Sequence, residues 1–119
     1  MSNPRRELDF LRDIEEAIER ILEYTASLTW EDFLRDHKTQ DAVVRNLEVI
    51  GEATRNLSDD FRLQHPGIPW RNMVGTRDRL THHYFGVNQE VVWQIVEQDL
   101  PGLKDKIAKL VTEFLKGGP

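Results

Sequence analysis

Apolar positions recur at spacings of three and four residues along most of the chain, which is typical of amphipathic helices. The first such segment begins at Pro4, with Ser2 or Asn3 as its cap. Its apolar stripe consists of Leu8, Leu11, Ile14, Ile18, Ile21, Leu22, Thr25 and Leu28. The opposite face is charged, so we expect a long helix that turns one face to a core. A coiled coil with a partner helix is the alternative.

A second long helix is predicted from about Lys38 to Leu57. It follows a short helical piece that starts at a Thr29–Asp32 capping sequence, whose inner face we expect to bury Trp30, Phe33 and Leu34. The stripe of the long helix is Val43, Leu47, Ile50, Thr54 and Leu57. Gly51 interrupts this pattern, where glycine costs up to about 1 kcal/mol relative to alanine. We therefore expect a close crossing of two helices at Gly51.

A central helix is predicted to open at Pro69 and to continue through Tyr84. It follows a turn capped by Ser58 and a proline-rich loop in which we expect His65 to lie at the surface. Its apolar stripe is Trp70, Met73, Val74, Leu80 and Tyr84. Gly75, within this stripe, suggests a second close approach between helices.

Two further helices are predicted at the C-terminal end. Asn88 is a suitable cap for a helix over Gln89–Gln98, after a break at Gly86, and Pro101 predicts a bend or restart. The last stripe is Leu103, Ile107, Leu110, Val111, Phe114 and Leu115, and the helix should stop at Gly117. No segment alternates with a period of two, so the fold class is all-α.

The composition predicts one domain over residues 1–119, because 119 residues suffice for one compact core. There is no cysteine, which excludes disulfides, thiolate zinc sites and a cysteine nucleophile. The four histidines do not have the spacing of a known zinc motif, so we assign no metal and no cofactor. Charges run through the first 28 residues, so we expect a cytoplasmic protein without a membrane segment.

The formal net charge of −5, from 16 Lys and Arg against 21 Asp and Glu, argues against binding nucleic acid through a broad basic face. Any nucleic-acid chemistry must then depend on a local positive patch. Arg71, Arg77 and Arg79 are the candidates for such a patch.

The segment from Arg77 to Tyr84 combines a fixed cation, a carboxylate, an imidazole and a phenol within about two helical turns. Arg77 suits phosphate oxygens, and His82, with an ordinary pKa of about 6.5, can move protons near neutrality. Asp78 lies one turn before His82 and can orient its ring. On a straight helix Arg77 and His82 would point roughly 140° apart, so the helix must distort or two chains must share the site. The alternative is a solvated helix face with His82 and Tyr84 as packing residues.

This segment resembles the R-x4-H-x-Y motif of the HepT toxins, a branch of the HEPN ribonuclease superfamily, with Arg77, His82 and Tyr84 at the motif positions. The resemblance extends over nearly the whole chain. Residues 41–53 are similar to the second-helix signature of the family, residues 68–71 and 77–87 to its central helix, and Trp93 with Asp99-Leu100-Pro101 to its C-terminal pattern.

The resemblance implies a HEPN-like helical bundle with two long antiparallel helices, a central motif-bearing helix and shorter C-terminal helices. It also implies a metal-independent endoribonuclease, the toxin of a type VII toxin–antitoxin system. Its homodimer would bring the motif residues of two chains into one cleft. There His82 would act as general acid or base on RNA, Arg77 would stabilise the phosphorane and Asp78 would orient His82.

The family resemblance further implies a partner, an MntA-like nucleotidyltransferase antitoxin that uses ATP to transfer AMP onto Tyr84. Arg79, Arg71 and Arg45 are candidates for RNA binding. Two other readings stay open: a catalytically silent helical partner of a nucleotidyltransferase, and a purely structural helical protein. The acidic charge balance favours the silent partner, whereas Arg77, Asp78 and His82 together favour the enzyme.

Overall fold

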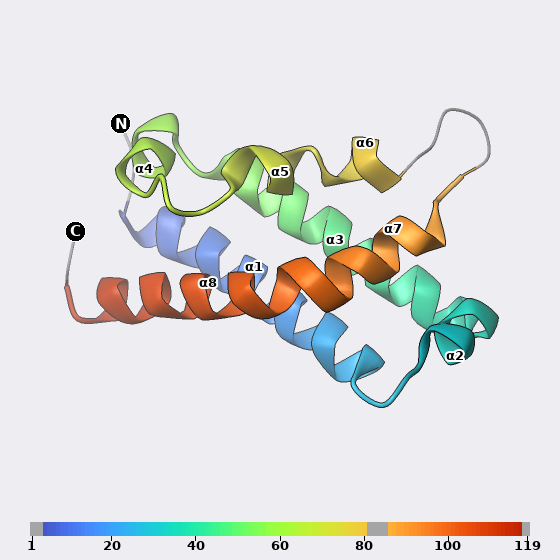
Figure 1. The fold of residues 1–119 in the computed structure, drawn as a ribbon. Coiled ribbons are helices and arrows are strands. Elements are labelled where there is room, and N and C mark those ends of the chain that lie inside the picture. Colours follow the sequence, from blue (N-terminus) through green and yellow to red (C-terminus); the bar gives the residue numbers. More distant parts are fainter. Residues whose placement is uncertain (1–3, 81–85, 118–119) are drawn as a thin grey trace.

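The computed structural model describes residues 4–80 and 86–117, and these form helices with no β-strand element among them (Figure 1). The elements are α1 (Pro4–Thr25), α2 (Trp30–Arg35), α3 (His37–Asn56), α4 (Asp59–Gln64), α5 (Trp70–Val74), α6 (Thr76–Leu80), α7 (Gln89–Gln94), the π-helical segment η1 (Ile95–Asp99) and α8 (Leu100–Leu115). The prediction of an all-α bundle is confirmed.

The long helices α1 and α3 run side by side in opposite directions, and α8 packs along α1 (Figure 1). Most of the predicted apolar stripe of α1 is buried, with Ala17 added to it; Leu8 and Leu22 are only partly buried, and Leu28 lies beyond the end of the helix. The core formed by α1, α3 and α8 includes Leu11, Ile14, Ile18, Ile21, Val43, Leu47, Ile50, Leu103 and Ile107.

The caps of the helices follow the sequence. The Thr29 hydroxyl accepts a hydrogen bond from the Asp32 backbone N–H at 3.1 Å, and the Asp32 carboxylate accepts one from the Thr29 backbone N–H at 3.1 Å. Ser58 caps α4 in the same way through the Phe61 backbone N–H. The apolar assignment was wrong at two positions: Leu34 and Leu115 are exposed, because each lies on the outer side of its helix.

The sequence pattern predicted one continuous central helix, but the structure divides it at Gly75 into α5 and α6. Gly75 has φ −81° and ψ 3°, outside the helical range, and the low helix propensity of glycine favours a break there. Among the described residues, a β-carbon on Gly75 would meet only the Arg71 carbonyl oxygen of its own turn, so they show no second helix approach there. The crossing predicted at Gly51 is confirmed: a β-carbon there would lie 3.2 Å from the Met73 carbonyl oxygen.

The C-terminal elements follow one another without a loop. The Leu100 backbone N–H donates to the Ile95 carbonyl oxygen, five residues earlier, which inserts a π turn just before Pro101. Because proline has no N–H and crowds the preceding turn, a wider turn accommodates it without ending the helix. The bend predicted at Pro101 is therefore a π segment that joins α7 to α8.

Two polar side chains beside α4 are at least half-buried, and one of them was predicted to lie at the surface. His65 is half-buried rather than at the surface, with its ring centroid 4.6 Å from that of Phe61. Glu7 is only 4% exposed, and its carboxylate accepts from the Ser58 backbone N–H at 3.3 Å. Glu7 therefore ties the start of α4 to α1, and the ring of His65 packs on Phe61 of α4.

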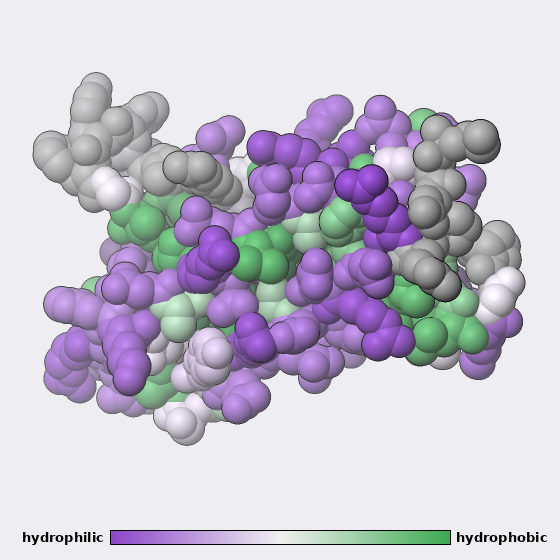
Figure 2. All heavy atoms as spheres, turned by 180° about the vertical axis from the view of Figure 1, so that it is seen from behind, coloured by the Kyte–Doolittle hydropathy of each residue, from purple (hydrophilic) through white to green (hydrophobic). Residues whose placement is uncertain are grey.

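Most of the face seen from behind is covered by polar residues, with smaller apolar areas between them (Figure 2). This is the distribution expected when each amphipathic helix turns its charged side outward. Within the described part of the chain, no helix combines the length and the apolar character needed to cross a membrane.

Candidate functional site

The predicted catalytic segment begins on α6, a helix of five residues. Leu80 is 2% exposed and anchors this short helix to the core, whereas Asp78 and Arg79 are exposed. The Thr76 hydroxyl donates to the Asn72 carbonyl oxygen at 3.0 Å, across the break between α5 and α6. The sequence thus places an apolar anchor, Leu80, directly after two charged residues that face outward.

The chain returns to α6 at Asn88, whose backbone N–H donates to the Leu80 carbonyl oxygen at 2.7 Å. This bond fixes the two ends of the segment that carries the rest of the motif. His82 and Tyr84 lie outside the described residues, as does the side chain of Arg77. The predicted cooperation of Asp78 with His82 therefore stays a prediction.

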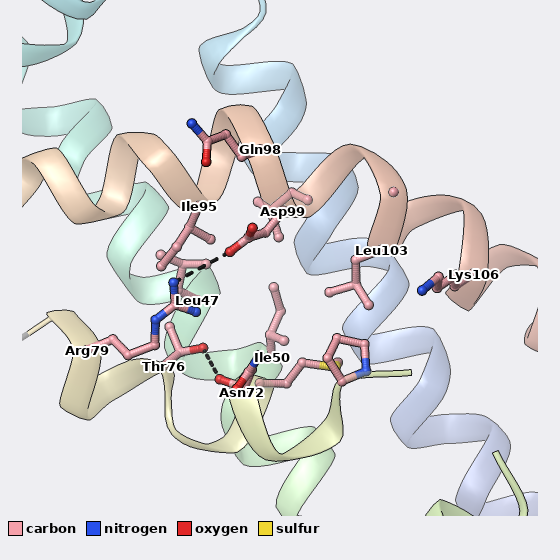
Figure 3. Close-up of a pocket in the computed structure, with 14 residues that line it drawn as sticks. Leu47, Ile50, Asn72, Thr76, Arg79, Ile95, Gln98, Asp99, Leu103 and Lys106 are labelled. Atoms are coloured by element: carbon pink, nitrogen blue, oxygen red, sulfur yellow. Dashed lines mark hydrogen bonds and ion pairs between the residues drawn. The ribbon is translucent and has the colours of Figure 1, made fainter. Parts of the chain in front are cut away.

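A cavity of about 560 Å³ lies between α3, the α5–α6 pair and the C-terminal run of η1 and α8 (Figure 3). Arg79 and Asp99 meet at one end of it, with a guanidinium nitrogen 3.6 Å from a carboxylate oxygen. The lining residues are Leu47, Ile50, Pro69, Asn72, Met73, Thr76, Arg79, Ile95, Gln98, Asp99, Leu100, Gly102, Leu103 and Lys106.

The three candidate RNA-binding arginines line three different cavities. Arg79 lines the cavity just described, Arg71 a cavity of about 880 Å³ beside α4 and α5, and Arg45 one of about 200 Å³ along α3. Arg71 and Arg45 are both exposed. The positive charge around α6 is thus distributed over several hollows of the surface.

Sequence reasoning missed two residues of the cavity beside α6. Asp99 was noted only within a family pattern, and its position opposite Arg79 depends on the π turn, which no local signal predicted. Lys106 gave no signal, because an exposed lysine on an amphipathic helix is common. Its ammonium group donates to the Gly67 carbonyl oxygen at 3.1 Å and so ties α8 to the loop before α5. Among the described residues, no three His, Asp or Glu side chains group as metal ligands.

Comparison with known proteins defines the class to which this fold and segment belong. Residues 14–110 match the family model described as "Ribonuclease HepT-like". The chain belongs to this family, and its resemblance to the HepT branch is confirmed.

Named relatives cover almost the same length. A protein of Thermococcus cleftensis named "Probable ribonuclease HepT" is 54% identical over 106 residues, which is 89% of this chain and 96% of the relative. A protein of Methanocaldococcus jannaschii named "Putative RNase" is 45% identical over 105 residues, 88% of this chain and 87% of the relative. Another "Putative RNase", of Caldanaerobacter subterraneus, is 36% identical over 111 residues, 93% and 96% of the two chains. No solved structure matches this chain significantly.

Proposed function

We propose that the protein is a metal-independent endoribonuclease, the toxin of a type VII toxin–antitoxin pair, and that it acts on RNA in the cytoplasm. The observation that carries the proposal is the conjunction of family membership over residues 14–110 with Arg77, His82 and Tyr84 at the R-x4-H-x-Y positions. The names of the relatives, which describe ribonucleases, support the same activity.

The proposed reaction needs only side chains and the RNA itself. His82 takes the proton of the 2'-hydroxyl as its oxygen attacks the adjacent phosphorus, and the bond from phosphorus to the 5'-oxygen breaks. The leaving 5'-oxygen takes a proton from protonated His82, which now acts as general acid, so the products are a 2',3'-cyclic phosphate and a 5'-hydroxyl. Arg77 stabilises the charge that develops on the phosphorane oxygens, and Asp78 orients the ring of His82.

A homodimer completes the proposed site by bringing the motif segments of two chains into one cleft. The spacing of the motif supports this arrangement, because Arg77 and His82 would point roughly 140° apart on one straight helix. Arg79, Arg71 and Arg45 are proposed to contact the RNA backbone around the cleft. Such local contacts are compatible with a net charge of −5.

The proposed control of activity is modification of Tyr84 by an MntA-like nucleotidyltransferase. The Tyr84 phenol oxygen attacks the α-phosphorus of ATP, pyrophosphate leaves, and the phenol proton passes to solvent. The attached AMP is bulky and anionic, so it would occupy the cleft and offset the charge of Arg77.

A catalytically silent partner of the nucleotidyltransferase is the alternative function. The acidic charge balance and the distribution of Arg45, Arg71 and Arg79 over separate cavities favour it, because a free ribonuclease usually concentrates positive charge.

Replacement of His82 distinguishes the two functions. His82→Ala should remove growth inhibition on induction and reduce RNA cleavage by the purified protein by about 10²- to 10⁴-fold. The matched control is His83→Ala, a histidine next to the motif position with no proposed role. Equal toxicity and equal cleavage by wild type and His82→Ala, with both folded by circular dichroism, would rule out the proposed catalysis.

A further inference from the structure

The cavity beside α6 has an apolar floor and charged ends. Its floor residues are each less than a tenth exposed: Leu47, Ile50, Met73, Ile95 and Leu103. Arg79 and Asp99 stand together at one end and Lys106 at the other (Figure 3). Pockets of about 300–1,000 Å³ with this division hold ligands that have an apolar body and a few polar groups. Two cations beside an apolar floor favour a ligand with an anionic end.

Among the described residues, Asp99 is the ion-pair partner of Arg79, and it holds the guanidinium only loosely. Its distance of 3.6 Å to Asp99 exceeds hydrogen-bond length, and the two side chains are 45% and 51% exposed. Exposed ion pairs of this kind contribute little to stability. Arginine also offers five N–H donors in a planar fork, which matches two oxygens of a phosphate. Arg79 can therefore exchange Asp99 for a phosphate at small cost.

The backbone explains why Asp99 stands at this end of the cavity. Asp99 is the last residue of the π turn that accommodates Pro101, and the extra residue in that turn rotates it relative to a regular helix. An anion that approaches Arg79 must therefore compete with a carboxylate that the fold keeps in place.

We infer that this cavity is a subsite for one nucleotide of a single-stranded RNA, with the base on the apolar floor and its phosphate on Arg79. The inference rests on the proposed function, because Arg79 lies two residues after Arg77 and three before His82. Asp99 lowers the affinity of the subsite by holding Arg79 until a phosphate displaces it. Lys106 is placed to meet a neighbouring phosphate. The RNA must be single-stranded at this nucleotide, because the bases of a duplex are stacked on their neighbours and do not expose their faces.

Binding of a fluorescent 2'-O-methyl RNA oligonucleotide tests this subsite apart from cleavage, because the oligonucleotide lacks the free 2'-hydroxyl that the reaction needs. Fluorescence anisotropy at several salt concentrations gives the affinity and the number of phosphate contacts. Arg79→Gln should weaken binding several-fold and reduce the slope of log K against log salt by about 0.7, the value for one contact to a single strand. Asp99→Asn should strengthen binding about two- to fivefold, and should have no effect in the Arg79→Gln background.

The cavity itself is tested at Gly102, which lines it and where a built β-carbon has no atom within 4 Å. Gly102→Phe should fill the cavity and weaken binding of the oligonucleotide at least tenfold, whereas Gly102→Ala should bind as wild type does. Unchanged or weaker binding by Asp99→Asn, or equal binding by the two Gly102 variants, would overturn the inference. So would loss of nucleotidyltransferase binding in Gly102→Phe with oligonucleotide binding intact, since the cavity would then hold a protein.

The two proposals fail in different ways. If the oligonucleotide binds and the variants behave as expected, but no unmodified RNA is cleaved, then the catalytic proposal is wrong and the subsite stands. If the wild-type protein does not bind the oligonucleotide, the subsite is wrong, whatever the result of the cleavage assay.

Discussion

Gly51 of α3 lies so close to Met73 of α5 that a β-carbon on Gly51 would stand 3.2 Å from the Met73 carbonyl oxygen. The obstructing atom belongs to the backbone, which cannot rotate away as a side chain can. This contact sets how near α5, and the α6 segment that follows it, lies to the long helix α3. The low helix propensity of Gly51 is therefore accepted in exchange for a close approach of α3 to α5, which positions the proposed catalytic segment.

Replacing Gly51 with leucine should lower the free energy of unfolding by about 2 kcal/mol or more, because the new side chain must push α5 away from α3. The measurement is urea denaturation followed by circular dichroism. The matched control is Gly102→Leu, at a helical glycine with open space around its β-carbon, which should leave stability unchanged or raise it by up to about 1 kcal/mol. Equal stability of the two variants would show that the crossing at Gly51 is not tight.

The buried carboxylate of Glu7 connects α1 to the start of α4 through the Ser58 backbone N–H. Glu7→Leu replaces the carboxylate with an apolar side chain of similar size and leaves that N–H without its partner, which should cost about 1–3 kcal/mol. Glu7→Gln retains an acceptor oxygen and should cost less. Thermal unfolding of both variants, with Asp9→Leu as an exposed control on the same helix, measures the difference. If Glu7→Leu unfolded at the wild-type temperature, the bond to Ser58 would have no role in stability.

The carboxyls of Asp32 and Asp36, which cap α2 and α3, should make the free energy of unfolding depend on pH. The backbone N–H and then the hydroxyl of Thr29 lower the pKa of Asp32, and the hydroxyl and then the backbone N–H of Thr39 lower the pKa of Asp36. Because both carboxyls bind protons less readily in the folded state, their contribution is present above their ordinary pKa of about 3.8 and is lost as pH falls through the lowered values.

Replacing both Asp32 and Asp36 with asparagine should therefore make the melting temperature fall less steeply between about pH 5 and pH 2. The control Asp13→Asn removes a charge from the exposed face of α1 and should leave the decline as in the wild type. A double variant with the same acid dependence as the wild type would mean that the caps do not couple to protonation.

The spacing of apolar residues predicted most of the fold, because the formation and the ends of helices depend largely on local sequence. The stripes of α1, α3 and α8, the caps at Thr29, Ser58 and Asn88, and the break at Gly86, which has φ +74°, all follow from residue type and spacing. Spacing alone did not divide the central helix at Gly75 or convert the bend at Pro101 into a π turn. Both outcomes depend on how neighbouring helices hold the chain, which a pattern along one helix does not record.

Some features of the candidate site could also be predicted from local sequence, whereas others depend on how the helices pack. Residue chemistry singled out Arg77, Asp78 and Arg79, and α6 presents Asp78 and Arg79 outward. The pairing of Arg79 with Asp99 joins residues twenty positions apart and depends on the π turn, so no motif could predict it. A cavity lined by several helices far apart in the sequence likewise becomes visible only once these helices are packed.

The last prediction concerns Tyr84, the proposed site of AMP transfer. Tyr84→Phe removes the phenol oxygen that would attack ATP but keeps the aromatic ring, so the variant should cleave RNA within about threefold of the wild type, since the ring has no proton to move in the reaction. Co-expression with the nucleotidyltransferase should then add the mass of one or more AMP units to the wild type and none to Tyr84→Phe, as read by intact-protein mass spectrometry. Growth should be rescued for the wild type but not for Tyr84→Phe. Tyr24→Phe, an exposed tyrosine on α1, is the matched control and should gain the same mass as the wild type. Full neutralisation of Tyr84→Phe by the partner with ATP would show that inhibition depends on binding rather than on modification, because the variant has no acceptor oxygen at this position.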